Sequence, residues 1–148
     1  MISLTSFIRM ENKETYINLF NQVEKLKNSE DPKRKYEYIL WLGKKLKTPN
    51  NNILIPENKV QGCVSEVFVK ASLLEGKLYW EGYSDALITK GLLAFLIAGM
   101  KELTPKEVIN INYKFIEDSG LKASLTPSRS NGFLNILLKM QSQANDFL

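Results

Sequence analysis

The sequence predicts an α+β fold in which a small antiparallel sheet of about three strands packs against helices. The first observation is a pair of N-terminal segments with apolar residues at helical spacing, separated by a helix-capping Asp31-Pro32. The second is a pair of alternating segments, residues 65–73 and 77–83, joined by Glu75-Gly76 in the manner of a β-hairpin. The third is a series of later segments that begin at a helix-capping serine or threonine. The chain has 148 residues, 44% hydrophobic and 24% charged, and is interpreted as one domain over residues 1–148.

The two N-terminal segments predict a helical hairpin. The first helix is expected over residues 11–27, where one helical stripe holds the apolar side chains Tyr16, Leu19, Phe20, Val23 and Leu26. The second is expected to run from Pro32 to about Leu46, because Thr48-Pro49 ends it. Its expected buried residues are Tyr36, Ile39, Leu40 and Gly43.

A long irregular connection, residues 47–62, leads to Cys63. Connections of this length are uncommon in a compact domain unless they are functional or mobile. We expect Ile53, Leu54 and Ile55 to pack near the Cys63 thiol or to cover it. A third short strand is expected at residues 58–61, since a two-stranded hairpin alone is marginal.

The hairpin is expected to bury one face, formed by Val67, Val69, Ala71 and Leu73 with Leu78 and Trp80. The next helix is expected to have Ser84 as its N-cap and Asp85 in its first turn, and to end near Met100. The apolar residues of this helix occupy nearly all of its faces, which predicts a central buried helix. Close packing against the sheet would explain Gly91, and the helix end would explain Gly99.

Three further helical segments follow. A short helix is expected at residues 105–110 after Thr104-Pro105, and another at residues 113–118, ended by Gly120. The last helix should run from Thr126-Pro127 to about Ala144. Arg129 lies in its first turn, where the helix dipole disfavours a cation, so we expect a partner for it. The candidates are Asp85 and the Cys63 thiolate.

Cys63 is the only cysteine, and the chain has no histidine. A papain-like nucleophile needs an imidazole, a tetrahedral zinc site needs several Cys or His ligands, and an intrachain disulfide needs a second thiol. Gly62 favours a tight turn that would present the thiol at a loop tip. The residues alone leave two interpretations open, an inert buried thiol or a thiol that reacts with a group brought to it.

The segment Val60-Gln61-Gly62-Cys63-Val64-Ser65-Glu66-Val67-Phe68 resembles a family signature. It is similar to the V-P-G-C-x-S-x-V-W motif of the SufE/CsdE family, sulfur acceptors for cysteine desulfurases in iron–sulfur cluster assembly. Further stretches match in register: residues 82–86 and 90–92, 103–105, and 125–132. Gln61 replaces the usual proline, which should loosen the loop, and Phe68 replaces tryptophan, which removes an N–H donor.

The resemblance implies a SufE/IscU-like fold and a transient persulfide on Cys63, with no other cofactor. It implies as partners a PLP-dependent cysteine desulfurase of the SufS/CsdA type, which the protein would stimulate, and a downstream iron–sulfur scaffold of the SufBCD type. Supporting or partner-binding roles are expected at Gly62, Ser65, Ser84, Asp85, Lys90 and Arg129. Each of these also has a structural interpretation as a turn residue, a cap, a solvated charge or an ion pair. A cation at Arg129, Lys59 or Lys90 would raise the thiolate fraction of Cys63, unless the partner supplies the activation.

Two other function classes remain open: a non-catalytic interaction module with an inert Cys63, and a sulfur carrier for another thiolation pathway. A cluster scaffold of the IscU type is disfavoured, because it would need several ligands. We interpret the net charge of +4 and the basic cluster from Lys33 to Lys47 as a solvated helix face, not a nucleic-acid site. No apolar run reaches the ~18 residues of a membrane span. Residues 1–10 lack signal-peptide features, and a lone cysteine fits the reducing cytoplasm.

Overall fold

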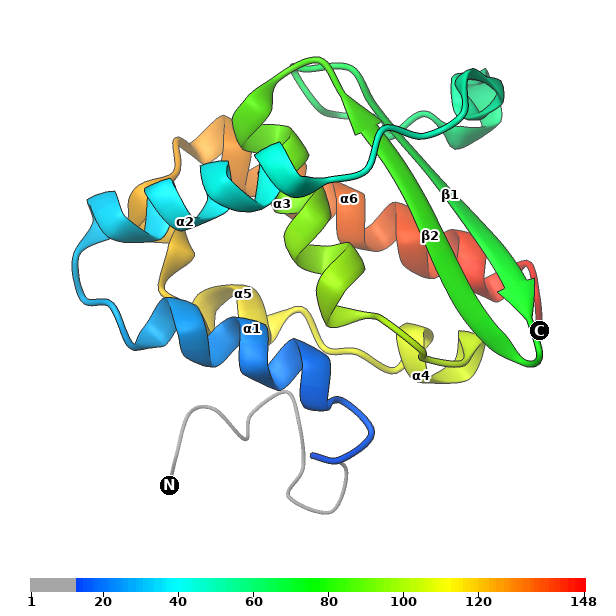
Figure 1. Ribbon diagram of the computed structural model, residues 1–148, viewed down its shortest axis with the longest axis horizontal. Helices are drawn as coiled ribbons and strands as arrows, with labels where there is room; N and C mark the ends of the chain where they lie inside the picture. Colours follow the sequence, from blue (N-terminus) through cyan, green and yellow to red (C-terminus); the bar gives the residue numbers. More distant parts are fainter. Residues whose placement is uncertain (1–12) are drawn as a thin grey trace.

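The computed structural model describes residues 13–148 and has the predicted α+β architecture (Figure 1). The expected helix start at Glu11 and the interpretation of residues 1–10 lie outside the described range. The helices are α1 (Ile17–Lys27), α2 (Pro32–Lys45), α3 (Leu87–Gly99), α4 (Pro105–Ile109), α5 (Lys114–Asp118) and α6 (Pro127–Asn145). The strands are β1 (Val67–Leu74) and β2 (Lys77–Ser84), and short 3₁₀ turns lie at η3 (Asn51–Ile53), η4 (Pro56–Asn58) and η5 (Leu121–Ser124).

Helix α3 is the central element, as its all-round apolar sequence predicts. It packs against α1, α2, α6 and β2, and its side chains are buried along most of its length. Gly91 was expected to pack closely against the sheet, but its close neighbour is α2. A Cβ at Gly91 would overlap the Ile39 carbonyl oxygen, and a Cβ at Gly43 would lie 2.7 Å from the Leu87 carbonyl oxygen. The two glycines therefore let α3 approach α2, not the sheet, and α3 ends at Gly99 as expected.

Helices α1 and α2 run in opposite directions, as a helical hairpin should, and both pack on α3 (Figure 1). The Asp31 side chain caps α2 by accepting a 2.9 Å hydrogen bond from the Lys33 backbone N–H. The Tyr38 hydroxyl links the two helices by donating to Gln22 Oε1 at 2.7 Å. One member of the basic cluster departs from the expectation of a solvated face. Lys35 is 8% exposed, and its Nζ donates to the Ser119 carbonyl oxygen at 3.2 Å.

The sheet contains two antiparallel strands, in the register that pairs Val67 with Ser84 and Leu74 with Lys77. The expected third strand at residues 58–61 is reduced to an isolated bridge between Lys59 and Phe68. In β1 the buried residues lie in the first part of the strand, from Val67 to Ala71, whereas β2 also buries Leu78 near the turn. Leu73, expected in the buried face, is accordingly 43% exposed.

The outer edge of β1 is closed by a side chain from α6. Gln143 accepts a 2.9 Å hydrogen bond from the Ala71 backbone N–H and donates a 2.7 Å bond to the Val69 carbonyl oxygen. Its amide therefore occupies the place that a neighbouring strand would take. On the opposite edge of the sheet, the Leu78 N–H donates to the Leu103 carbonyl oxygen at 2.8 Å.

The C-terminal elements begin at the predicted caps. Thr104 and Glu107 form a capping box at α4, and the Thr126 side chain accepts a 3.2 Å bond from the Arg129 N–H at the start of α6. Gly120 has φ +73°, in the left-handed region, where the chain turns after α5. Helix α6 then lies along β1 and α3, so that its N-terminal turns lie beside Cys63.

Candidate functional site

Cys63 lies in a loop whose base is closed by the backbone. The Val60 N–H donates to the Val67 carbonyl oxygen at 2.8 Å, and residues 61–66 project beyond this bond. Gly62 has φ +80°, a conformation that strongly favours glycine. The residue after the cysteine, Val64, is 90% exposed. The thiol is therefore placed at the tip of a turn that leads into β1, as the Gly62-Cys63 pair predicts.

The Cys63 side chain is turned inward against α6 and is partly buried. Its Sγ lies 3.8 Å from the Gly132 carbonyl oxygen, a long sulfur hydrogen bond. A hollow of about 20 Å³ adjoins the thiol. It is lined by the loop residues Cys63, Val64 and Ser65, by Thr89 and Leu92 of α3, and by Ser128, Arg129 and Gly132 of α6. Such a volume accepts about one water-sized group.

The expectation that Ile53, Leu54 and Ile55 cover the thiol is wrong. None of them lines the hollow, which lies on the helical side of the loop. Turns η3 and η4 pack on β1 instead, with Ile53 buried and Leu54 and Ile55 about 40% exposed.

Burial raises the pKa of the Cys63 thiol above its usual value. Removal of the charged form from water is the cause, and no cation in residues 13–148 offsets the rise. Of the three cations considered, Arg129 lines the hollow, whereas Lys59 lies at the loop base and Lys90 on α3 outside the hollow. The surroundings of Cys63 therefore favour the protonated thiol over the thiolate.

Ser84 and Asp85 lie near the site but not in the places expected for them. Ser84 is the last residue of β2, and the N-cap of α3 is Ala86, which has no side-chain cap. The Ser84 Oγ accepts a 3.2 Å bond from the Ala86 N–H, and Asp85 Oδ1 accepts a 3.1 Å bond from the Glu66 N–H. Both residues thus order the chain beside the base of the cysteine loop.

Of the two partners expected for Arg129, Asp85 is not joined to it in residues 13–148, and a pairing with the Cys63 thiolate stays a prediction. Within the part of the chain that the structure describes, no salt bridge joins Arg129 to Asp85, whose carboxylate bonds to Glu66. Arg129 does share the wall of the hollow with Cys63 and Ser65. Its side chain is exposed, so it lies at the entrance to the hollow.

Two residues of α6 that sequence reasoning missed hold the loop. The Asn135 Nδ2 donates to the Gly62 carbonyl oxygen at 3.2 Å, and a Cβ at Gly132 would lie 3.5 Å from Cys63 Sγ. A glycine inside a helix costs helix propensity, which was the available signal at Gly132. Asn135 had no comparable signal, because a helical amide resembles any solvated polar residue.

No group of three or more His, Cys, Asp or Glu side chains in residues 13–148 could hold a metal ion. None of the helices described has the combined length and apolar character that a bilayer crossing requires.

Comparison with known proteins gives consistent matches. The model of the SufE family, described as an Fe-S metabolism associated domain, matches residues 21–144. An uncharacterized SufE-like protein of Synechocystis sp. is 49% identical over 130 residues, which cover 88% of this chain and 82% of that protein. The cysteine desulfuration protein SufE of Plasmodium falciparum is 31% identical over 138 residues, covering 84% of this chain and 55% of that one.

A solved structure has the same fold. The solution structure of a hypothetical protein from Thermus thermophilus superposes with a TM-score of 0.76 and 23% sequence identity. The match covers 87% of this chain and 94% of that one. At this identity the likeness concerns the fold alone.

Proposed function

We propose, on the premise that the chain belongs to the SufE family, that Cys63 accepts persulfide sulfur from a cysteine desulfurase. The observation that carries the proposal is the placement of the single thiol. It lies at the tip of a loop with a closed base, turned into a small hollow, with an exposed residue beside it. An inert core cysteine would not need a left-handed glycine, a projecting loop and a hollow at its sulfur atom.

The proposed transfer is a thiol exchange. The Cys63 thiol loses its proton to a base of the partner site, and the thiolate attacks the outer sulfur of the partner's Cys–S–SH group. A new S–S bond forms on Cys63 while the partner's S–S bond breaks, and its inner sulfur leaves as a thiolate. No net oxidation occurs, because one persulfide is replaced by another. In this scheme the partner supplies the activation, because burial in the resting protein raises the pKa of Cys63.

The hollow explains how the product would be kept. A persulfide adds one sulfur atom beyond Sγ, and the space beside Sγ accepts about one atom group. With the loop closed, Leu92 and Gly132 would shield that sulfur from small reductants. With the loop open, the persulfide would be presented to the next acceptor. The loop tip is tied by the Asn135 bond to Gly62 and by the long Cys63 contact, so few interactions oppose its release.

The donor in this scheme is a PLP-dependent desulfurase of the SufS/CsdA type, stimulated when its persulfide is removed. The acceptor is an iron–sulfur scaffold of the SufBCD type. We place the reaction in the reducing cytoplasm, where a lone cysteine remains a free thiol.

The test mixes the purified protein with its cognate desulfurase and L-cysteine, followed by intact-mass measurement. We expect a gain of one sulfur atom that is absent in Cys63→Ser, together with faster desulfurase turnover only for the wild-type chain. An unchanged mass and unchanged turnover with the cognate enzyme would refute the proposal and favour a non-catalytic interaction module. Transfer of the sulfur to a thiolation enzyme, but not to a cluster scaffold, would assign the carrier role to another pathway.

A further inference from the structure

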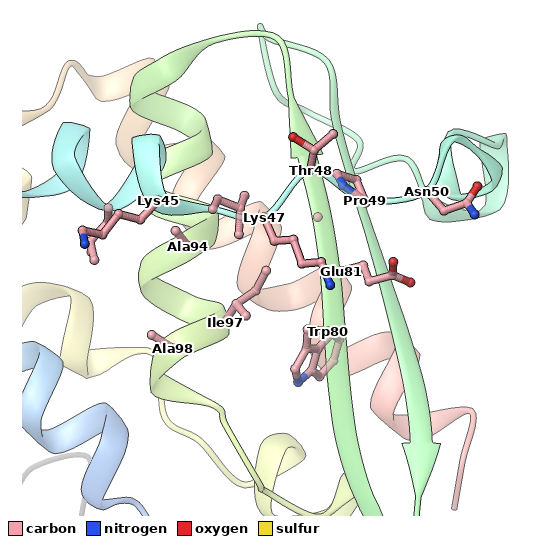
Figure 2. Close-up of a pocket in the computed structure, with 13 residues that line it drawn as sticks. Lys45, Lys47, Thr48, Pro49, Asn50, Trp80, Glu81, Ala94, Ile97 and Ala98 are labelled. Atoms are coloured by element: carbon pink, nitrogen blue, oxygen red, sulfur yellow. The ribbon is translucent and has the colours of Figure 1, made fainter.

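A second site lies on the side of α3 that faces away from Cys63. A cleft of about 790 Å³ opens between the end of α2, α3 and the outer edge of β2 (Figure 2). Its apolar lining includes Leu42, Leu46, Trp80, Ala94, Ile97 and Ala98. Figure 2 shows Lys47 extending from the end of α2 toward β2, where Trp80 lies. The size is typical of a site that holds a ligand or a short peptide segment.

The floor of the cleft contains an open sheet edge. In the β1–β2 register, Glu81 pairs with Lys70, and the neighbouring residues of β2 direct their backbone groups away from β1. The Leu78 N–H, bonded to Leu103, has this outward direction. Trp80 and Gly82 share it, yet their outward N–H and C=O groups have no hydrogen-bond partner in residues 13–148. Unpaired edge groups of this kind are a template for another strand.

Two side-chain features fit the approach of another backbone. Gly82 has no side chain, and a Cβ there would overlap Leu93, so nothing projects from this position into the cleft. The Trp80 Nε1 is buried and has no hydrogen-bond acceptor among the described residues. An acceptor supplied from outside the described chain would satisfy this donor, which is otherwise costly to bury.

The charge of the cleft indicates the chemistry of its occupant. Lys45 and Lys47 line it against a single carboxylate, Glu81. The Lys45 Nζ lies 4.6 Å from the Trp41 ring centre, whereas the exposed Lys47 extends toward β2 in Figure 2. We propose that this cleft binds an extended segment of a partner protein, with alternating apolar and acidic residues, as a third strand on β2. Its apolar side chains pack on α3, and an acidic side chain faces Lys47.

This binding mode leaves the cysteine free. The cleft is lined by Ala94, Ile97 and Ala98, whereas the hollow at Cys63 is lined by Thr89 and Leu92 of the same helix. A partner can therefore be held on β2 while the cysteine loop is released. The proposal does not depend on sulfur transfer, because it is based on the open edge of β2 and on the unpaired indole N–H of Trp80.

The test is backbone amide hydrogen exchange by NMR on the full chain. The probe is a synthetic peptide, acetylated and amidated, that alternates valine and aspartate. Without it, the Trp80 and Gly82 amides should exchange faster than those of Tyr79 and Glu81, which bond to β1. With saturating probe, the Trp80 and Gly82 amides and the indole N–H should slow by about tenfold or more. Tyr79 and Glu81 should change little, and they serve as internal controls.

Matched variants separate backbone pairing from charge attraction. A probe N-methylated at the amides that face β2 should lose binding, because it cannot donate to the Trp80 carbonyl oxygen. Lys47→Glu should weaken binding of the acidic probe by about fivefold, whereas the exposed Lys44→Glu, outside the cleft, should have little effect.

Four outcomes would overturn the proposal. The first is slow exchange at Trp80 and Gly82 without probe, which would mean that another part of the chain or a second copy covers the edge. The second is equal binding of the N-methylated probe. The third is protection that maps to another surface. The last is no saturable change up to about 1 mM probe, the weak end of specific binding.

Discussion

Replacement of Gly132 by alanine should fill part of the hollow while it keeps the Cys63 thiol, so it tests the hollow separately from the thiol. Gly132 lies inside α6 with ordinary helical backbone, and an added Cβ would be 3.5 Å from Cys63 Sγ. This is normal van der Waals contact, so the closed resting site should accept the methyl group. The hollow has only about 20 Å³, however, and the methyl group would take up part of it. Gly132→Ala should therefore leave the thiol in place and exclude the outer sulfur of a persulfide.

Gly132→Ala should change two quantities: it should raise the stability of the fold and shorten the lifetime of the persulfide. Alanine is a better helix former than glycine by up to about 1 kcal/mol, which should raise the melting temperature by about 3 °C in a chain of this size. If the methyl group forces the outer sulfur out of the hollow, the closed persulfide state should lose on the order of 1 kcal/mol of free energy. The population with an exposed persulfide should then rise about fivefold. The variant should thus be more stable, yet lose its persulfide faster.

The assay loads both proteins with cysteine and desulfurase, removes the enzyme, and follows loss of the extra sulfur by intact mass in dilute reductant. Asn131→Ala is the matched control, because this exposed residue of α6 gains helix propensity without entering the hollow. A wild-type rate of sulfur loss in Gly132→Ala would refute the sheltering role. A lower melting temperature would show instead that the space beside Sγ is too small for a methyl group.

Three further predictions concern the loop, the thiol and the helix contact. Asn135→Ala removes the bond to Gly62 and should speed alkylation of Cys63 by about fivefold, measured by mass under conditions of rapid loop exchange. Because the pKa of Cys63 is raised in the folded state, the protonated thiol contributes to the free energy of unfolding. This contribution is complete below the ordinary thiol pKa of about 8.5 and is lost as pH rises through the pKa of the folded protein. Denaturant titrations against pH should show this decline in the wild type and a flatter curve in Cys63→Ser. Gly91→Ala must separate α3 from the Ile39 backbone and should cost about 2–3 kcal/mol of unfolding free energy; an unchanged denaturation midpoint would contradict that packing.

The sequence predicted the elements well because their signals are local. Asp31, Thr104 and Thr126 are followed by proline and begin helices, and the structure has side-chain caps at all three. The prediction that Ser84 is a helix N-cap was wrong, because a serine hydroxyl can form another kind of local hydrogen bond. Its hydroxyl accepts a bond from the N–H two residues later, which a sequence cannot distinguish from a helix cap.

The sequence predicted the centre of the candidate site but only part of its wall: Ser65 and Arg129 line the hollow as candidate site residues, whereas the contacts of Gly132 and Asn135 were missed. Gly62 and Cys63 are neighbours in sequence, so their turn could be inferred from the residues themselves. The wall requires knowledge of which helix lies beside the loop, and that depends on the packing of α6 against β1 and α3. Ile53 shows the same limit, because its apolar character indicated burial but not the side of the hairpin on which it is buried.

The hydrogen bond between Val60 and Val67 also has a kinetic consequence. Because the hinge points are joined to each other and Glu66 is held by Asp85, we expect residues 61–65 to move without breaking a rung of the β1–β2 ladder. Excursions of such a short loop belong to the nanosecond-to-microsecond range, whereas global unfolding is slower by many orders of magnitude. We therefore expect Cys63 to reach the surrounding solution by a local opening of its loop that leaves the rest of the domain unchanged.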